Sequence, residues 1–242
     1  MNPAAVTVEN AAGRSPILLI CEHASSYMPQ DYADLGLAPE DRLRHIAWDI
    51  GAAELARQLS ARLDAPLFLA GYSRLLIDCN RPPGAPSSIP TRSEETDIPG
   101  NHGLSADEIA RRTAQYFTPF QDRIAAFLDA RTAPCIIIGV HSFTPVFRGE
   151  RRIWHVGVLT GEAVTLRARL IAGLSADPAL IVGDNEPYRI EVEEDYTVPV
   201  HGDARGIPAA LIEVRQDLLG DAEGIAEWTA RLAPVLAEAA PA

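Results

Sequence analysis

The sequence has no lysine, and all 21 of its basic residues are arginine. Without a lysine amine the chain cannot form a Schiff base, a P-loop lysine contact or a lysine general base. Acidic residues are in excess, 33 against 21, and the formal net charge is −12. This charge disfavours nucleic acid and anionic membrane surfaces as partners. Arginine, in contrast, is well suited to bidentate recognition of carboxylates.

Cysteines and long apolar runs are also scarce. The three cysteines, Cys21, Cys79 and Cys135, form no Cys-x-x-Cys pair and each lies in an apolar run, which predicts reduced, buried thiols. No apolar stretch approaches the roughly 20 residues that a membrane-spanning helix needs. Residues 1–15 contain one arginine and no apolar core, so they do not resemble a secretory signal. We expect a flexible tail over residues 1–15, a single domain over 16–242 and a cytoplasmic protein.

Strand-like and helix-like segments alternate along the chain. Apolar and β-branched runs predict strands at 17–21, 67–70, 75–79, 135–140, 154–159, 180–182 and 209–214. Apolar residues at helical spacing predict helices at 39–63, 105–130, 162–174 and 221–239. This alternation predicts an α/β fold in which helical layers enclose a mainly parallel sheet. Two irregular segments, 81–103 and 184–205, interrupt the pattern, and we predict that both lie over the sheet as substrate-covering loops.

Two of the predicted strands lead directly into a histidine. The run 17–21 is followed by Glu22 and His23, and the run 135–140 by His141. Ligands of open α/β sheets bind beyond the carboxyl ends of the strands, where both histidines are expected. Two imidazoles at one sheet edge favour a zinc site, which takes a further ligand from His, Asp, Glu or Cys. A structural, hydrogen-bonded role is the alternative for each histidine.

Three residues compete for the place of the third ligand. Glu22 is next to His23, but neighbours on an extended strand point to opposite faces. Asp49 follows His45 by four residues, so the two share a face of the predicted helix and could themselves chelate a metal. We favour Asp49 over His45, because a helix that leaves the first strand can return a carboxylate above the sheet.

Glu213 is a carboxylate inside the apolar strand predicted at 209–214, and Arg215 shares its face. A buried acid is unfavourable unless it is paired or needed for function. One interpretation is a structural salt bridge between these two side chains. The other is a general base with a raised pKa that activates the attacking water, with Arg215 binding a substrate carboxylate.

Further polar residues surround the run predicted as a strand at 75–79. On an extended chain Arg74, Asp78 and Asn80 share one face, and Arg81 begins the following loop. Arg74 and Asp78 could form a plain ion pair, whereas Arg81 is the better clamp for a substrate carboxylate. His201, in the second irregular segment, could polarise a substrate carbonyl or simply be exposed.

The order of these motifs resembles the N-formylglutamate amidohydrolase family. The resemblance rests on Cys21-Glu22-His23-Ala24-Ser25, Ser73-Arg74-x3-Asp78-x-Asn80-Arg81-Pro82, His141-Ser142, Asn185-Glu186-Pro187-Tyr188, His201-Gly202 and Ile212-Glu213-Val214-Arg215-x-Asp217-Leu218. No motif is specific alone, but their joint order is. Other members carry a Pro-His-Ser-Gly type of turn around the first histidine, so this chain resembles a divergent subgroup.

The resemblance implies a three-layer α/β/α fold of the zinc-exopeptidase type with a mixed sheet. It implies hydrolysis of the N-formyl or other small N-acyl amide of an acidic amino acid, such as N-formylglutamate, with one Zn²⁺ or another divalent ion. The implied metal-site residues are His23, Asp49 and His141, and the implied acid–base is Glu213. The implied site-lining residues are Arg74, Asp78, Asn80, Arg81 and Arg215. We add His201 as a group that could stabilise the oxyanion.

Two other hypotheses remain open at this point. The same scaffold could bind acyl amino acids through its arginines without catalysing a reaction. It could also be a zinc amidase with another peptide-like substrate. In each case the expected partner is a small molecule.

Overall fold

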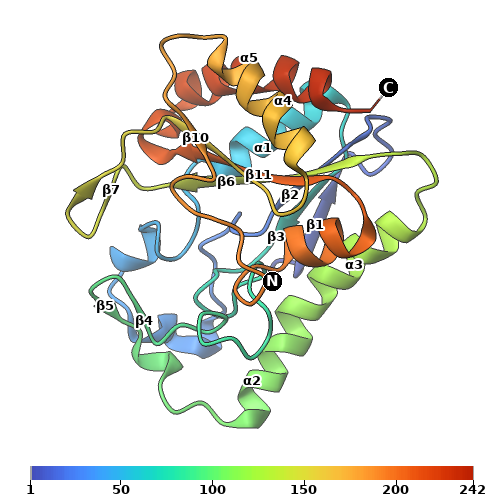
Figure 1. Cartoon of the computed structure of the whole chain (residues 1–242). Coiled ribbons are helices and arrows are strands. Elements are labelled where there is room, and N and C mark those ends of the chain that lie inside the picture. Colours follow the sequence, from blue (N-terminus) through green and yellow to red (C-terminus); the bar gives the residue numbers. More distant parts are fainter. Residues whose placement is uncertain (1, 242) are drawn as a thin grey trace.

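The computed structural model describes residues 2–241 (Figure 1). Within this range a seven-stranded sheet has the order β1-β3-β2-β6-β11-β9-β10. Its strands are β1 (Val6–Glu9), β2 (Ile17–Cys21), β3 (Leu67–Ala70), β6 (Ile136–Phe143), β9 (Val156–Leu159), β10 (Val182–Asp184) and β11 (Ala209–Arg215). The β1/β3 and β9/β11 pairs are antiparallel and the other pairs are parallel. The predicted α/β fold with a mainly parallel, mixed sheet is confirmed.

The two central strands β2 and β6 are buried along their whole length. Every residue of both strands is buried, as expected where helices cover both faces of a sheet. Each buried Leu or Ile side chain contributes roughly 1.5–3 kcal/mol relative to an exposed one. The apolar sequence therefore places these strands in the middle of the sheet, and the segments at their carboxyl ends build the site.

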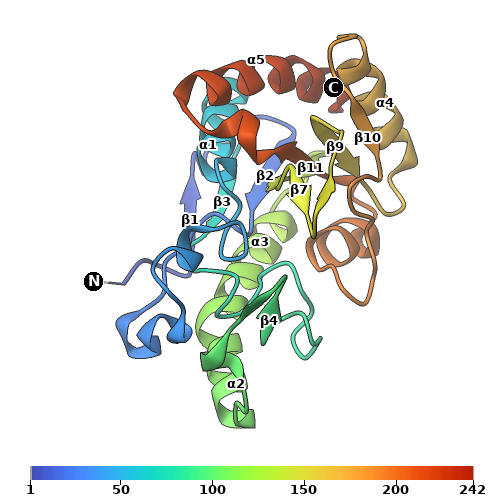
Figure 2. The ribbon, with the colours of Figure 1, turned by 90° about the vertical axis from the view of Figure 1, so that its left-hand side faces the viewer.

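Helices pack on both faces of the sheet. α1 (Ala52–Leu63), α4 (Val164–Ser175) and α5 (Ala222–Ala239) cover one face (Figure 1). α3 (Thr118–Asp129) and the π-helical η5 (Thr197–Gly202) cover the other. α2 (Ala106–Arg112) continues into α3 through the π-helical η4 (Thr113–Phe117), and α2 extends beyond the sheet (Figure 2). The predicted three-layer arrangement is confirmed.

Short elements connect these layers. The 3₁₀ turns are η1 (Gln30–Gly36), η2 (Asp41–Leu43), η3 (Pro99–Asn101), η6 (Asp203–Arg205) and η7 (Gln216–Leu219). One hairpin consists of β4 (Arg92–Ser93) and β5 (Thr96–Asp97), and another of β7 (Val146–Phe147) and β8 (Glu150–Arg151). Both hairpins contribute residues to the wall of the pocket described below.

Two predicted elements are wrong in type or extent. Residues 75–79 form a turn and not a strand. Leu75 and Leu76 are buried, but side-chain N–H groups of Asn101 and Arg112 donate to their carbonyl oxygens. Side chains that are distant in sequence thus supply the hydrogen-bond donors that a neighbouring strand would supply in a sheet. The helix predicted from residue 39 begins only at Ala52, because the preceding residues form η2 and turns that lead to the site.

The expectation of a flexible tail over residues 1–15 is wrong for β1. This strand pairs with β3, from Val6 opposite Ala70 to Glu9 opposite Leu67. Val6 and Val8 share a face, as alternate residues of a strand do, and pack against the apolar cluster on the α3 side. β1 therefore covers the hydrogen-bonding edge of β3, which would otherwise be open.

The three cysteines are free and buried, as predicted. Burial raises the pKa of Cys21 and Cys79 well above the ordinary value, and nearby carboxylates raise it further. Both thiols therefore stay protonated at neutral pH and are poor nucleophiles. Among residues 2–241, no helix combines the length and the apolar character needed to cross a membrane.

Candidate active site

Strand register brings His141 and Glu213 together. β11 runs parallel to β6 with Glu213 beside His141, so the two side chains point to the same face of the sheet. This is the face that α3 covers. His23 follows β2, and its ring centroid lies 4.9 Å from that of His141. The structure thus brings together the two histidines that the sequence predicts at one sheet edge.

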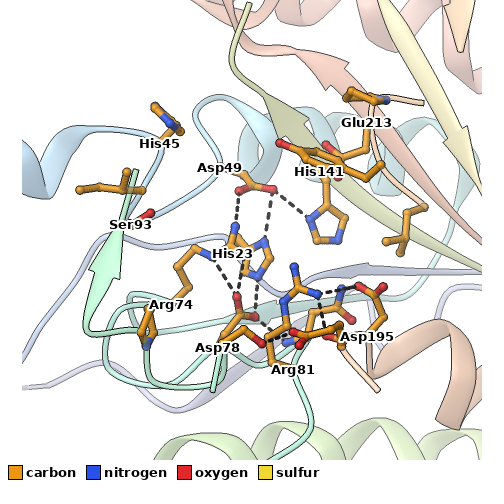
Figure 3. Close-up of a pocket in the computed structure, with 18 of the residues that line it drawn as sticks. His23, His45, Asp49, Arg74, Asp78, Arg81, Ser93, His141, Asp195 and Glu213 are labelled. Atoms are coloured by element: carbon orange, nitrogen blue, oxygen red, sulfur yellow. Dashed lines mark hydrogen bonds and ion pairs between the residues drawn. The ribbon is translucent and has the colours of Figure 1, made fainter. Parts of the chain in front are cut away.

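Asp49 lies between the two imidazoles (Figure 3). Its Oδ2 is 2.9 Å from Nδ1 of His141 and 3.4 Å from Nδ1 of His23. The backbone N–H of Ser142 donates to the same oxygen, and the N–H of Asp49 donates to the carbonyl of His23. Asp49 precedes α1 and is not part of a helix, so the helical face that it was predicted to share with His45 does not exist.

The outer nitrogen of each imidazole meets another carboxylate. Oδ1 of Asp78 is 2.7 Å from Nε2 of His23, and Oε2 of Glu22 is 3.0 Å from Nε2 of His141. The hydroxyl of Thr197 donates to the second oxygen of Glu22. Carboxylates in this position orient imidazoles that bind metals and hold the proton on Nε2. The Nδ1 atoms, on the side of Asp49, are then the nitrogens that would bind a metal in place of a proton.

Buried charges of both signs face one another in the site. Burial alone would raise the pKa of Asp49, but the two imidazoles hold it far below its usual range. Burial likewise opposes the lowered pKa of Asp78, which Arg74 and His23 produce. The pKa of Glu22 is also lowered, against burial, by His141. The same carboxylates raise the pKa of His23 and His141 against the effect of burial. Without a metal, protons on the two imidazoles and the guanidinium of Arg74 balance these carboxylates, and a bound divalent ion would displace the protons on the ligand nitrogens.

The donor atoms fit a divalent metal. One ligand atom from each of His23, Asp49 and His141 lies within 4.8 Å of the other two, and all three residues are buried. Two imidazole nitrogens and one carboxylate oxygen form a set that Zn²⁺ accepts, with a position left for water or substrate. Glu22 lies on the outer side of His141, so Asp49 is the residue positioned as the third ligand.

Glu213 is a buried acid without a partner. Its Oε2 has no hydrogen-bond partner within residues 2–241. Burial raises the pKa of Glu213 to about 7, and the nearby charge of Asp49 acts in the same direction. A carboxyl group with a pKa near neutrality can both accept and return a proton at neutral pH.

A pocket of about 880 Å³ opens over these side chains. Its wall includes residues between 86 and 94 and between 186 and 195, so the predicted placement of both irregular segments over the sheet is confirmed. Asn80 ties them together, since its side chain accepts from the N–H of Thr197 and contacts Asp195. Arg81 lies beside Asp195 (Figure 3), and its Nη1 donates to the carbonyl oxygen of Glu194.

Arg74 is bound to the carboxylates of the site. Its Nε donates to Oδ2 of Asp78 at 2.9 Å, and its Nη1 lies 3.5 Å from Oδ1 of Asp49. The plain ion pair with Asp78 is therefore present. This arginine braces the carboxylates around His23, although it also lines the pocket.

Three residues considered from the sequence are not brought to the chemistry. Arg215 binds Asp217 at 2.7 Å and does not line the pocket, so the predicted salt bridge with Glu213 does not form. The strand ends at Arg215, which frees its side chain to turn back to η7. His201 is buried against Gln121 and is also absent from the pocket wall. His45 lines the pocket but pairs with Glu94.

Sequence reasoning assigned no role to Tyr188, which also lines the pocket. The motif Asn185-Glu186-Pro187-Tyr188 was the only available signal. Likewise, the contacts of Glu22 and Asp78 with the outer imidazole nitrogens had no signature in the sequence, because they join separate loops.

The fold and the site define an α/β protein with a buried donor set for a divalent metal and an acid of raised pKa beside it. Residues 15–220 match the family profile described as N-formylglutamate amidohydrolase. The chain belongs to this family, which comprises hydrolases acting on a carbon–nitrogen amide bond.

Two solved structures are similar to this chain over nearly its whole length. A gene product of Agrobacterium tumefaciens is 38% identical with a TM-score of 0.94, and the match covers 98% of this chain and 95% of that chain. The N-formylglutamate amidohydrolase of Ralstonia eutropha JMP134 is 18% identical with a TM-score of 0.66, over 98% of this chain and 97% of that chain. The similarity to the Ralstonia eutropha protein is a similarity of fold. No curated protein is similar enough in sequence to count as a match.

Proposed function

We propose that this amidohydrolase cleaves the N-formyl or other small N-acyl amide of an acidic amino acid such as N-formylglutamate. His23, Asp49 and His141 would hold one Zn²⁺ or another divalent ion. When bound, such an ion polarises the substrate carbonyl and lowers the pKa of the attacking water. The observation that carries the proposal is the position of Glu213, an unpartnered buried carboxyl group in register with His141.

Glu213 acts first as a base and then as an acid. Water attacks the carbonyl carbon, forms the new C–O bond and gives one proton to the carboxylate of Glu213. Glu213 then passes this proton to the amide nitrogen as the C–N bond breaks. The products are the free amine of the amino acid and the carboxylic acid, which is formic acid for an N-formyl substrate. The pKa of about 7 suits both proton transfers.

Asp78 and Glu22 act through the histidines. Asp78 accepts a hydrogen bond from Nε2 of His23, and Glu22 forms an ion pair with Nε2 of His141 at 3.0 Å. Both contacts keep the inner nitrogen of the ring available as a ligand. Arg74 keeps Asp78 charged and in place. We therefore assign Arg74 and Asp78 to the support of the metal site, and not to direct contact with the substrate.

Arg81 is the residue that we assign to the substrate carboxylate. It uses Nη1 for its contacts with Glu194 and Asp195. Its Nε and Nη2 have no hydrogen-bond partner in residues 2–241, and this pair of donors matches a carboxylate in bidentate geometry. Asn80 supports the same wall through Asp195. We assign no substrate contact to Arg215 or His201.

The test is a turnover screen with metal control. Protein stripped with a chelator and reloaded with Zn²⁺ is given N-formyl, N-acetyl and N-succinyl glutamate, and release of the free amine is measured. N-formylleucine, which keeps the α-carboxylate but has no carboxylate in its side chain, serves as the control. We expect metal-dependent turnover with a preference for the acidic substrates. Turnover that survives complete removal of metal would contradict the metal assignment, and binding without turnover would favour the non-catalytic alternative.

A further inference from the structure

Arg152 holds the hydroxyl of Tyr188 at the pocket wall. Nη1 of Arg152 donates a hydrogen bond of 2.7 Å to the phenol oxygen. The same guanidinium lies over the rings of Tyr188 and Phe147, with its carbon 4.6 Å from each centroid. The cation–π contact and the hydrogen bond from Arg152 together hold the phenol ring in one position. Phe147 and Tyr188 both line the pocket, whereas Arg152 does not.

The direction of this hydrogen bond leaves the phenol proton available. A guanidinium has donors only, so the phenol oxygen must be the acceptor. Within residues 2–241 the O–H of Tyr188 has no acceptor of its own. A hydrogen bond received from a charged donor also polarises the O–H and strengthens it as a donor. Burial and the charge of Glu213 raise the pKa of Tyr188, so the phenol stays protonated at neutral pH.

The main chain before Tyr188 lies directly beside Glu213. Gly157 on β9 is opposite Glu213 on β11, so a side chain at either position points to the same face. A Cβ at Gly157 would lie 2.0 Å from the carbonyl oxygen of Glu186. The segment that leads into Tyr188 therefore occupies the space that a side chain next to Glu213 would fill.

The same segment is anchored to the end of β9. The N–H of Asn185 donates to the carbonyl of Val158, and the side-chain oxygen of Asn185 accepts from the N–H of Thr160. Tyr188 itself is 40% exposed, so a molecule in the pocket can reach it. The result is an accessible hydrogen-bond donor on a fixed segment, on the same face as the acid of the site.

We propose that Tyr188 is a further catalytic residue, whose O–H donates to the oxygen of the scissile carbonyl as that oxygen becomes negatively charged. Arg152 is a positioning residue that holds the phenol and polarises it. No proton is transferred in this step, since the phenol keeps its hydrogen and the hydrogen bond strengthens as charge develops. The inference rests on the proposed function, because it needs an amide carbonyl in the pocket.

Kinetics of Tyr188→Phe test the donor directly. Loss of one oxyanion donor lowers kcat by about 10²- to 10³-fold, and we expect KM to stay close to the wild-type value. Tyr27→Phe is the matched control, because the hydroxyl of Tyr27 bonds Asn2 at the surface. This control should keep full activity. An unchanged kcat in Tyr188→Phe would overturn the proposal.

A double-mutant cycle that combines substitutions of Arg152 and Tyr188 tests the role of Arg152. Arg152→Met should lower kcat, and Arg152→Lys should recover part of it because lysine keeps a charged donor. In the double variant with Tyr188→Phe, loss of Arg152 should cause little further decrease, since both changes remove the same interaction. Independent, multiplicative losses would mean that Arg152 acts only on the structure. Thermal unfolding of each variant identifies such a structural effect.

A binding experiment separates this inference from the proposed function. A phosphonamidate that replaces the scissile carbonyl with tetrahedral phosphorus is titrated calorimetrically into the zinc-loaded protein. Tyr188→Phe should weaken its affinity by about the same factor as kcat, with the affinity for the product amino acid unchanged. Equal losses for both ligands would overturn the catalytic role. A wild-type protein that neither turns over acyl amino acids nor binds the phosphonamidate would refute the proposed function, and this inference with it.

Discussion

Oδ1 of Asp78 lies 2.7 Å from Nε2 of His23, while Nδ1 of the same ring faces Asp49. The imidazole is therefore held from behind by one carboxylate and directed towards another. Asp78 in turn is bound by Arg74. This chain of contacts connects the turn around residues 75–79 to the segment that follows β2, and under the proposed function it leaves Nδ1 of His23 as the nitrogen that binds the metal.

Asp78→Asn should weaken Zn²⁺ binding by about 10- to 100-fold, because the ring loses the carboxylate that orients it. Competition with a chromogenic chelator measures the affinity. Asp97→Asn is the matched control: Asp97 forms a similar pair with His102, at 2.8 Å, but both are exposed. Equal zinc affinity in the Asp78 variant and in wild type would show that Asp78 does not support the metal site.

Glu213→Gln should keep the fold and the metal but lower kcat by about 10²- to 10⁴-fold, the usual contribution of a general acid–base. The substitution is isosteric and leaves the backbone register with His141 intact. Zinc content and thermal unfolding, measured on the same preparation as kcat, separate chemistry from folding. Full turnover in this variant would remove Glu213 from the mechanism.

The pH dependence of kcat/KM should show an acidic limb that belongs to Glu213. A base acts only when deprotonated, so activity falls as the pH drops through its pKa, which is about 7 in the absence of metal. A bound cation favours the charged carboxylate and moves this limb to lower pH. Stopped-assay rates across the acidic range measure it. The limb should be missing from the residual activity of Glu213→Gln, and its persistence there would assign it to another group.

Gly157→Ala should displace the segment that carries Tyr188, because the new Cβ would lie 2.0 Å from the carbonyl oxygen of Glu186. We expect a loss of about 1–3 kcal/mol in stability and a decrease in kcat/KM of up to about 10²-fold. Gly220→Ala is the control, since a Cβ there would be 3.8 Å from the nearest heavy atom, an oxygen of Asp217. Denaturant unfolding and kinetics measure both effects. Similar behaviour of the two variants would contradict the close packing at Gly157.

Arg81→Gln should raise KM for N-formylglutamate, since a lost charge-assisted hydrogen bond costs about 1.5–3 kcal/mol, or about 10- to 150-fold. N-formylleucine should be affected far less, because it lacks the side-chain carboxylate. Asp195→Asn removes the ion pair of Arg81 at 3.3 Å but keeps the guanidinium, and so controls for disturbance of the loop. If both variants lose the same affinity for both substrates, Arg81 is not the carboxylate clamp.

Some of this architecture follows from local sequence. The runs 17–21 and 67–70 were predicted with the bounds that β2 and β3 have, because uninterrupted apolar runs of that length have few other ways to be buried. The meeting of His23 and His141 could also be predicted, because carboxyl ends of neighbouring parallel strands share one edge. Alternation along β11 identified the face of Glu213. None of this required knowledge of the loops.

What the sequence determined by itself is the set of buried strands and the edge at which their polar exits meet, since both depend on the short-range pattern of apolar residues. Tertiary structure alone decided the remainder. Residues 75–79 became a turn because Asn101 and Arg112 bind their carbonyl oxygens, and Arg215 left the site because Asp217 binds it. These contacts join segments whose approach depends on how the loops close over the sheet, and no periodicity in the chain encodes that closure.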